Sequence, residues 1–250
     1  MFGSVVVFQR CLRMFDGGVY DELMSTYDLI ATGYSSLRVR AWDVINELSR
    51  CVGLVVDVGC GPCHNGLAYA LRSGSKLLCV DLSQEMLRIA KKAAVRCEGG
   101  SMYYRVDMVQ ADMRYLPLRS DSTDCIMYVA SINHVVPEDL PTVLKEVRRV
   151  LKEGGKGLIT IWAATHPVVL RGLIRNLINV LLMRKRLKEL FDIRVPWRSK
   201  GKTYLRYYHI YRVSELVRHL RLLGLKVVKS GVYNPHRRSL PENYYLVLSK

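Results

Sequence analysis

The fold is decided by the stretch Val55-Val56-Asp57-Val58-Gly59-Cys60-Gly61-Pro62-Cys63. A β-branched run that breaks into glycines is typical of a buried parallel strand that turns sharply into a helix. Glycines let the backbone come close to a ligand, and an acidic residue about 20 positions further along can bind the hydroxyl pair of a ribose. Asp81 lies 20 residues after Gly61 and closes the next apolar run, residues 76–80. The pattern therefore predicts an adenosine-type cofactor at the carboxyl end of the first strand.

The same loop fits two other interpretations. Cys60 and Cys63 form a C-x-x-C with an internal Gly-Pro, as in thioredoxin-like redox sites, which also lie between a strand and a helix. The other alternative is a tight turn that binds nothing. A thioredoxin unit is much shorter than this chain, and it has no use for Asp57, Gly59 and the spaced Asp81. The cofactor interpretation is therefore favoured over the redox site and the plain turn.

Length and composition are those of a chain with one substantial core. The chain has 250 residues, 50% of them hydrophobic, so we expect one domain over residues 1–250. No apolar run approaches the ~20 residues that span a bilayer. Residues 1–8 make a poor signal peptide, because the run is short and no basic residue precedes it. We therefore expect a cytoplasmic protein with no membrane partner.

The seven cysteines are scattered along the chain, and their odd number argues against a complete disulfide framework. Only Cys60 and Cys63 are spaced as a pair, and no second pair completes a zinc site. We therefore expect no metal.

The formal net charge of +16 is concentrated in one part of the chain. Residues 171–221 hold 14 Lys and Arg against three acids, which is +11 of the total. A concentrated basic segment indicates a polyanionic partner, although it can also be a solvated face that keeps the protein dispersed. Aromatic residues are interleaved among these charges, which favours nucleic acid.

Alternating strand and helix patterns predict an α/β, doubly wound sheet. Strands are expected at 53–58, 76–80, 105–110, 124–130, 157–162, 226–233 and 243–249, and helices at 64–73, 83–96, 139–151 and 214–223. Before them, residues 20–50 are expected to be helical with a break at Thr32-Gly33, and Gly154-Gly155 to stop the helix before the fifth strand.

Residues 164–211 interrupt this alternation, and we expect a basic helical insertion there, after the fifth strand. Its apolar part, 168–183, is interpreted as a lid helix over a cleft, with a membrane-facing helix as the alternative. The expected parts are N-terminal helices over 1–50, a cofactor-binding core over 51–163, the insertion or lid over 164–211, and a C-terminal helix with strands over 212–250.

Further motifs resemble the class I methyltransferases that use S-adenosyl-L-methionine. They are the stretch 111–117, Asp124, the stretch 131–134 and the stretch 146–155. The resemblance implies a Rossmann-like, seven-stranded, mostly parallel sheet with helices on both faces. It also implies cofactor contacts by Asp57, Gly59 and Gly61 at the methionine end, Asp81 and Leu82 at the ribose, and Asp112 and Met113 at the adenine. Cys63 stands where that family usually has a third glycine.

The flanking segments resemble one group within that class, the methyltransferases that esterify 5-carboxymethyluridine at the tRNA wobble position. The matching stretches are 27–31, 34–38, 195–197 and 205–211, with Trp42 and Trp162. The resemblance implies the anticodon loop of a tRNA as partner, and a small zinc-binding activator protein along an edge of the sheet. The sequence departs from that group at Asp43, which replaces a proline, and at Asn133-His134, which replace paired histidines.

A carboxylate acceptor is already ionised at neutral pH, with a pKa of ~4, so its methylation requires no general base. The site then needs an anchor that orients the carboxylate, and a guanidinium holds one at two points. Arg38 and Arg206 are the candidate anchors, and His134 is the third predicted catalytic residue, at the cleft after the fourth strand. The predicted substrate-binding residues, including aromatics that could stack on an extruded base, are Tyr34, Trp162, Trp197, Tyr207 and His209. The alternative is a methyltransferase for a small-molecule or lipid-like substrate.

Overall fold

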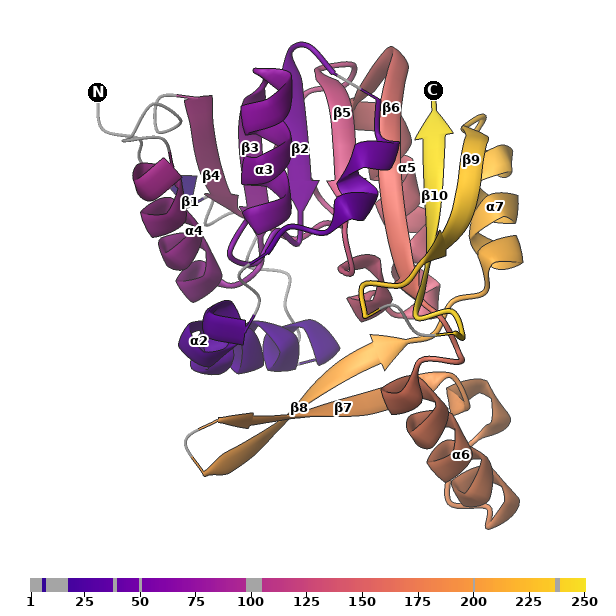
Figure 1. Cartoon of the computed structure of the whole chain (residues 1–250). Helices are drawn as coiled ribbons and strands as arrows, with labels where there is room; N and C mark the ends of the chain where they lie inside the picture. The colour runs from indigo at the N-terminus through magenta and orange to yellow at the C-terminus, as the bar shows by residue number, and fades with distance from the viewer. Residues whose placement is uncertain are drawn as a thin grey trace.

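Figure 1 shows a computed structural model of the chain. It describes residues 6–7, 18–37, 40–49, 51–97, 105–199, 201–236 and 239–250, and of residues 6–7 the backbone alone. Arg38, a predicted anchor, lies outside the described residues.

An eight-stranded sheet in the order β1-β4-β3-β2-β5-β6-β10-β9 forms the centre of the molecule. Its strands are β1 (Val6–Val7), β2 (Leu54–Val58), β3 (Lys76–Asp81), β4 (Val106–Gln110), β5 (Thr123–Tyr128), β6 (Leu151–Trp162), β9 (Lys226–Tyr233) and β10 (Asn243–Ser249). β10 runs antiparallel to β6 and β9, and the remaining pairs are parallel. The predicted seven-stranded, mostly parallel sheet is confirmed, and β1 adds a two-residue strand beside β4.

Helices cover both faces of this sheet (Figure 1). They are α3 (His64–Ser73) and α4 (Gln84–Arg96) on one face, and α5 (Leu140–Val150) and α7 (Val213–Leu222) on the other. The alternation of β2 explains the two layers, because successive side chains of a strand point to opposite faces. Val55 packs with the α3 and α4 residues, whereas Val56 and Val58 pack with those of α5 and α7.

Helix α2 (Val19–Leu37) is continuous, so the predicted break at Thr32-Gly33 is wrong. It runs beneath the carboxyl ends of the strands (Figure 1). A Cβ on Gly33 would lie 3.4 Å from the Ser199 Oγ. Gly33 therefore lets the segment that ends at Ser199 approach the helix closely. Packing stabilises the helix at this point and outweighs the low helix propensity of glycine.

Residues 164–211 are only partly helical. They form α6 (Pro167–Leu181) and then a β-hairpin of β7 (Asp192–Ser199) and β8 (Lys202–His209), which makes a separate two-stranded sheet. A helix is therefore present in the first part, whereas the prediction of helix is wrong for the second part. β-Branched and aromatic residues explain the hairpin. Ile193 and Val195 alternate with less buried residues along β7, and Tyr207 and Tyr208 lie in the wholly buried second half of β8.

The glycine pair Gly154-Gly155 does not end a helix. Helix α5 ends at Val150, and β6 begins at the next residue. The two glycines lie inside β6, where its pairing with β5 shifts register between Thr123 and Cys125. Glycine suits such an irregularity, and Gly154 takes a positive φ of 74°.

Among the described residues, no helix combines the length and the apolar character that crossing a bilayer requires.

Candidate active site

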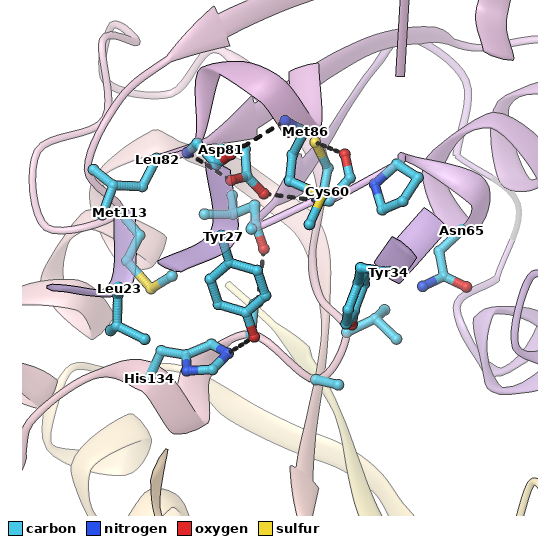
Figure 2. Close-up of a pocket in the computed structure, with 18 of the residues that line it drawn as sticks. Leu23, Tyr27, Tyr34, Cys60, Asn65, Asp81, Leu82, Met86, Met113 and His134 are labelled. Atoms are coloured by element: carbon cyan, nitrogen blue, oxygen red, sulfur yellow. Dashed lines mark hydrogen bonds between the residues drawn. The ribbon is translucent and has the colours of Figure 1, made fainter. Parts of the chain in front are cut away.

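A pocket lies at the carboxyl ends of β2 to β5, between the sheet and α2 (Figure 2). Helix α2 contributes Tyr20, Leu23, Met24, Tyr27 and Tyr34. The loops after the strands contribute six residues of the predicted cofactor set, which are Gly59, Gly61, Asp81, Leu82, Asp112 and Met113. None of the lining residues comes from 164–211, so α2 takes the covering position that the sequence analysis gave to residues 168–183.

The loop after β2 requires glycine at its first turn. Gly59 has φ +67°, and a Cβ there would lie 2.4 Å from the Ser131 Cβ, which no structure tolerates. Gly61 also has a positive φ, of 53°, and a Cβ on it would come no closer than 4.0 Å to the Tyr34 ring. The backbone at Gly61 is therefore open to a ligand. Cys63, in the place of the usual third glycine, adopts the same left-handed region with φ 61°.

Asp81 presents a carboxylate to the pocket with a fixed orientation. Its Oδ2 accepts a hydrogen bond from the Gly61 amide at 2.7 Å, and its Oδ1 accepts one from the Ser83 amide at 2.8 Å. Burial raises the pKa of Asp81 to about 6, although these amides partly offset the effect. Each oxygen keeps a free lone pair, so the ionised group can accept two further hydrogen bonds. That is the requirement of a ribose hydroxyl pair.

The other two predicted aspartates already have partners. Asp57 lies behind the loop, and its Oδ2 accepts from the Gly66 amide at 3.0 Å. Burial raises its pKa to about 7. Asp112 lines the pocket, and its carboxylate pairs with the Arg114 guanidinium at 2.7 Å. Asp57 therefore braces the start of α3, and direct contact of Asp57 with a cofactor stays a prediction.

The pocket as a whole fits an adenosine-type cofactor. It offers open backbone at Gly61, a carboxylate at Asp81, and apolar side chains in Leu82, Met86 and Met113 that suit the faces and edge of an adenine. Pockets of this make-up, mostly apolar with a few placed polar groups, are typical of cofactor sites.

Beside this pocket, four side chains form a chain of hydrogen bonds with a definite direction. His134 Nδ1 lies 2.7 Å from the Tyr207 carbonyl oxygen, which can only accept, so Nδ1 carries the hydrogen. Burial, together with the charge of Arg206, lowers the pKa of His134 to about 4, so the ring is neutral. Its Nε2 therefore accepts from the Tyr27 hydroxyl at 2.8 Å, as Figure 2 shows.

The chain continues to Arg206. The Tyr27 oxygen lies 3.4 Å from the Tyr208 hydroxyl, and the Tyr208 oxygen accepts from the Arg206 guanidinium at 3.2 Å. Because the Tyr27 hydroxyl already donates its hydrogen bond to His134, the Tyr208 hydroxyl is the donor to the Tyr27 oxygen. Each group donates to the next in the order Arg206, Tyr208, Tyr27, His134 and the Tyr207 carbonyl oxygen.

Arg206 is a buried cation with an unused donor. Only 5% of the residue is exposed, and its Nε has no hydrogen-bond partner among the described residues. The Trp197 Nε1 is likewise buried without a partner, and the Arg206 guanidinium lies 5.1 Å from the Trp197 ring. None of the described carboxylates pairs with Arg206. A buried charge without a counterion is costly, so this cluster suits an anionic ligand.

The remaining predicted substrate residues lie in three places. Tyr34 lines the pocket, and its ring centroid lies 5.2 Å from that of Trp197. The Trp162 ring stacks on the Tyr208 ring, with the centroids 4.7 Å apart, and so stabilises the position of Tyr208 in the cluster. Tyr207 and His209 lie on the other face of β8, where both bond the Asp192 carboxylate at 2.7 Å. Their roles toward a substrate stay predictions.

Several residues of the site are not among those predicted from the sequence. They include Tyr27 and Tyr208, which complete the hydrogen-bond chain, and Arg40 and His64, which line the pocket. Alternation along a strand would have found Tyr208, because it shares a face with Arg206 two positions earlier. No pattern in the sequence indicates that α2 reaches over the pocket.

The cysteines of the loop do not pair with each other. Cys63 forms a disulfide with Cys79 of β3, and Cys51 forms one with Cys125 of β5. Cys60 is not part of a disulfide. The Cys60–Cys63 redox site, one of the two alternatives for this loop, is therefore not the arrangement that the structure describes.

Comparisons with known proteins agree with this geometry. Residues 55–155 match the family model of a methyltransferase domain. The chain is 26% identical, over 82% of its length and 89% of the relative's, to the tRNA (carboxymethyluridine(34)-5-O)-methyltransferase of Schizosaccharomyces pombe. It is 29% identical, over 63% of its length and 65% of the relative's, to the ubiquinone/menaquinone biosynthesis C-methyltransferase of Syntrophotalea carbinolica.

A solved SAM-dependent methyltransferase from Methanosarcina mazei has the same fold, with a TM-score of 0.68 at 19% identity over 85% of this chain and 99% of that one. Residues 55–155 thus match a methyltransferase domain, the chain has the class I methyltransferase fold, and this fold and the pocket support S-adenosyl-L-methionine as the cofactor.

Proposed function

We propose that this protein methylates the carboxylate of 5-carboxymethyluridine at the wobble position of tRNA. The observation that carries the proposal is the Arg206 guanidinium, buried beside Tyr27 and Tyr208 with its Nε unpaired. A carboxylate would supply the missing counterion and accept from Nε and from the Trp197 Nε1. The S. pombe relative, named for this activity, supports the same acceptor.

The chain's own residues would align the acceptor and keep water away. When bound, the cofactor supplies the methyl group. The acceptor carboxylate is already ionised, so its oxygen has no proton to lose before transfer. Arg206 would orient the carboxylate, and Tyr208 and Tyr27 would hold Arg206 in place through His134. Because His134 is neutral and its Nε2 accepts from Tyr27, it acts here as a positioning residue rather than a base. Alignment of this kind supplies most of what such a displacement needs.

The basic segment would bind the anticodon stem-loop. The exposed cations at the tip of the β7–β8 hairpin, Arg198 and Lys202, would contact its phosphates. Phosphate contacts of this kind make affinity fall steeply with salt. A cytoplasmic location and a zinc-binding activator protein stay predictions of the sequence analysis.

The test is methyl transfer from labelled cofactor to tRNA that carries 5-carboxymethyluridine, followed by nucleoside mass spectrometry. We expect the methyl ester on the wobble nucleoside, and none on the same tRNA with an unmodified uridine. An inactive enzyme that still binds S-adenosylmethionine and tRNA would contradict the acceptor. An enzyme that binds the cofactor but not tRNA would contradict the whole proposal.

A second candidate is a methyltransferase for a lipid-like small molecule. The S. carbinolica relative, named for quinone biosynthesis, supports it. A quinol ring carries no carboxylate, so this candidate leaves the buried Arg206 charge unexplained. Transfer to a demethylated quinol, with no transfer to tRNA, would replace the first candidate by this one.

Cofactor affinity is expected to fall as the pH drops below about 6. A ribose needs the ionised form of Asp81, whose pKa burial raises to about 6, so binding must expel a proton at lower pH. Above that pH Asp81 is already ionised, and the affinity should be flat. Titration calorimetry from acidic to neutral pH measures this.

Two variants sharpen the pH test. Asp81→Asn should bind the cofactor weakly and without the pH dependence, whereas Asp57→Asn should keep the dependence because Asp57 does not line the pocket. A wild-type affinity that does not change between acidic and neutral pH would contradict the assignment of Asp81.

Tyr27→Phe is expected to weaken methyl transfer about 10-fold, the equivalent of ~1.4 kcal/mol. The ring stays, but the His134 Nε2 loses its donor and Tyr208 its acceptor, so Arg206 is held less firmly. Tyr233→Phe removes a hydroxyl that accepts from the Asp43 amide at 3.2 Å, in a residue that does not line the pocket, and serves as the control. Steady-state kinetics at saturating cofactor compare the two, and equal losses would show that the chain has no special part in transfer.

A further inference from the structure

Helix α6 exposes an apolar stripe. Leu170, Ile174, Leu177, Ile178 and Leu181 are between 47% and 72% exposed. Their spacing, i, i+4, i+7, i+8 and i+11, places them on one side of the helix. The apolar surface continues past the helix end with Leu182, Met183 and Leu187, which are also exposed.

The opposite side of α6 fixes the helix to the protein. Val169 packs with Ile193 of β7, and a Cβ on Gly172 would lie 3.0 Å from the Ile193 side chain. Asn176 donates to the Asp192 carbonyl oxygen at 2.6 Å. The helix therefore already has a buried side that packs against the protein, and the exposed stripe is a second apolar side.

The charge around the stripe is mainly positive, and the first acid after it, Glu189, lies 3.8 Å from Arg186. Residues 164–188 contain no Asp or Glu and six cations, which are Arg171, Arg175, Arg184, Lys185, Arg186 and Lys188. At about 100° per residue, Arg171 and Arg175 both lie along the edge of the stripe next to Ile178, and the other four cations follow the helix end. All but Lys185 are exposed.

This combination indicates an anionic lipid surface. An amphipathic helix with apolar side chains on one side and cations beside them lies in the interface plane of a membrane, and clusters of four to eight Lys and Arg attract anionic headgroups. RNA phosphates would use the cations but would leave the leucines and isoleucines in water. In Figure 1, α6 lies at one end of the β7–β8 hairpin, at the edge of the molecule and apart from the main sheet.

We propose that α6 and residues 182–188 dock the protein on membranes that contain anionic lipid. No residue of this segment lines the cofactor pocket, so docking leaves the pocket accessible. The proposal revises the expectation that the protein has no membrane partner, and it does not depend on which acceptor is methylated.

The test is flotation with vesicles of phosphatidylcholine alone and with about a third phosphatidylglycerol. The wild-type protein should float with the anionic vesicles and not with the neutral ones. Ile174→Ser with Ile178→Ser keeps the net charge and should lower vesicle affinity at least about 10-fold, because two buried aliphatic side chains are lost from the interface. Arg171→Gln with Arg175→Gln should lower it about 10-fold at low salt.

The matched control is Val228→Ser with Val232→Ser on the edge strand β9, where both valines are at least half exposed. This variant should bind vesicles as the wild type does, and S-adenosylmethionine affinity should show that every variant is folded. The proposal fails if the wild type does not float, or if the α6 serine variant floats equally well, which would mean attraction by net charge alone. It also fails if neither the wild type nor any variant binds vesicles and the arginine variant loses tRNA binding, because α6 would then be a contact surface for RNA.

Discussion

Replacement of Arg206 by glutamine is expected to lower kcat/KM for the modified tRNA at least about 100-fold, the equivalent of roughly 3 kcal/mol for a lost charged hydrogen bond. Glutamine is neutral and cannot hold a carboxylate at two points. The affinity for S-adenosylmethionine should not change, because Arg206 does not line the cofactor pocket. Single-turnover kinetics at saturating cofactor measure the effect.

Two further variants distinguish an anchor from a general contribution of charge. Arg206→Lys keeps the charge but loses the planar fork, and should recover only part of the activity. Arg198→Gln removes an exposed cation from the same hairpin, and should weaken tRNA binding without slowing the bound complex. If Arg206→Gln transferred methyl groups at the wild-type rate, the carboxylate would be held elsewhere.

Gly59→Ala is expected to abolish cofactor binding. The new Cβ would lie 2.4 Å from the Ser131 Cβ at a φ of +67°, and Ser131 cannot move freely because its hydroxyl donates to the Val58 carbonyl at 2.7 Å. The loop must shift, and with it the amides that orient Asp81. A loss of at least about 100-fold in affinity, equivalent to ~2.8 kcal/mol, should follow.

Gly154→Ala provides the matched control for Gly59→Ala. Gly154 has a φ of +74° but no atom within 4 Å of the added Cβ, so only the backbone penalty of roughly 1–2 kcal/mol applies to it. This variant should be less stable and should bind the cofactor normally. Ser131→Gly combined with Gly59→Ala removes the clashing atom and should restore part of the binding. No restoration would show that φ, rather than the contact, decides the loss.

The core of the fold could be predicted because its local signals agree with one another. Residues 54–58 carry a β-branched run, and the glycines after it leave few other structures for the chain. The same holds for 76–81 and for the helix 84–96, whose cap is the Ser83 hydroxyl that accepts from the Met86 amide. The prediction for β6 is too short because a Gly-Gly pair normally ends an element. Here Gly154 and Gly155 stay inside the strand, where its pairing with β5 is irregular.

The acceptor side could not be predicted, because long-range packing decides it. Nothing local indicates that Gly33 leaves space for Ser199, or that α2 covers the pocket. On β8, the choice between Tyr207 and Tyr208 depends on which face meets the body of the protein. The hairpin turns Tyr208 toward His134 and Tyr207 toward Asp192.

The β7–β8 hairpin pairs with no strand of the main sheet, and yet it supplies Trp197, Arg206 and Tyr208. Its backbone can therefore be exchanged without breaking a single hydrogen bond of the cofactor-binding strands. A change of acceptor could thus be made in this one ribbon while residues 55–155 stay as they are. Grafting the ribbon of a relative between residues 191 and 210 is accordingly the shortest route to a redesigned enzyme.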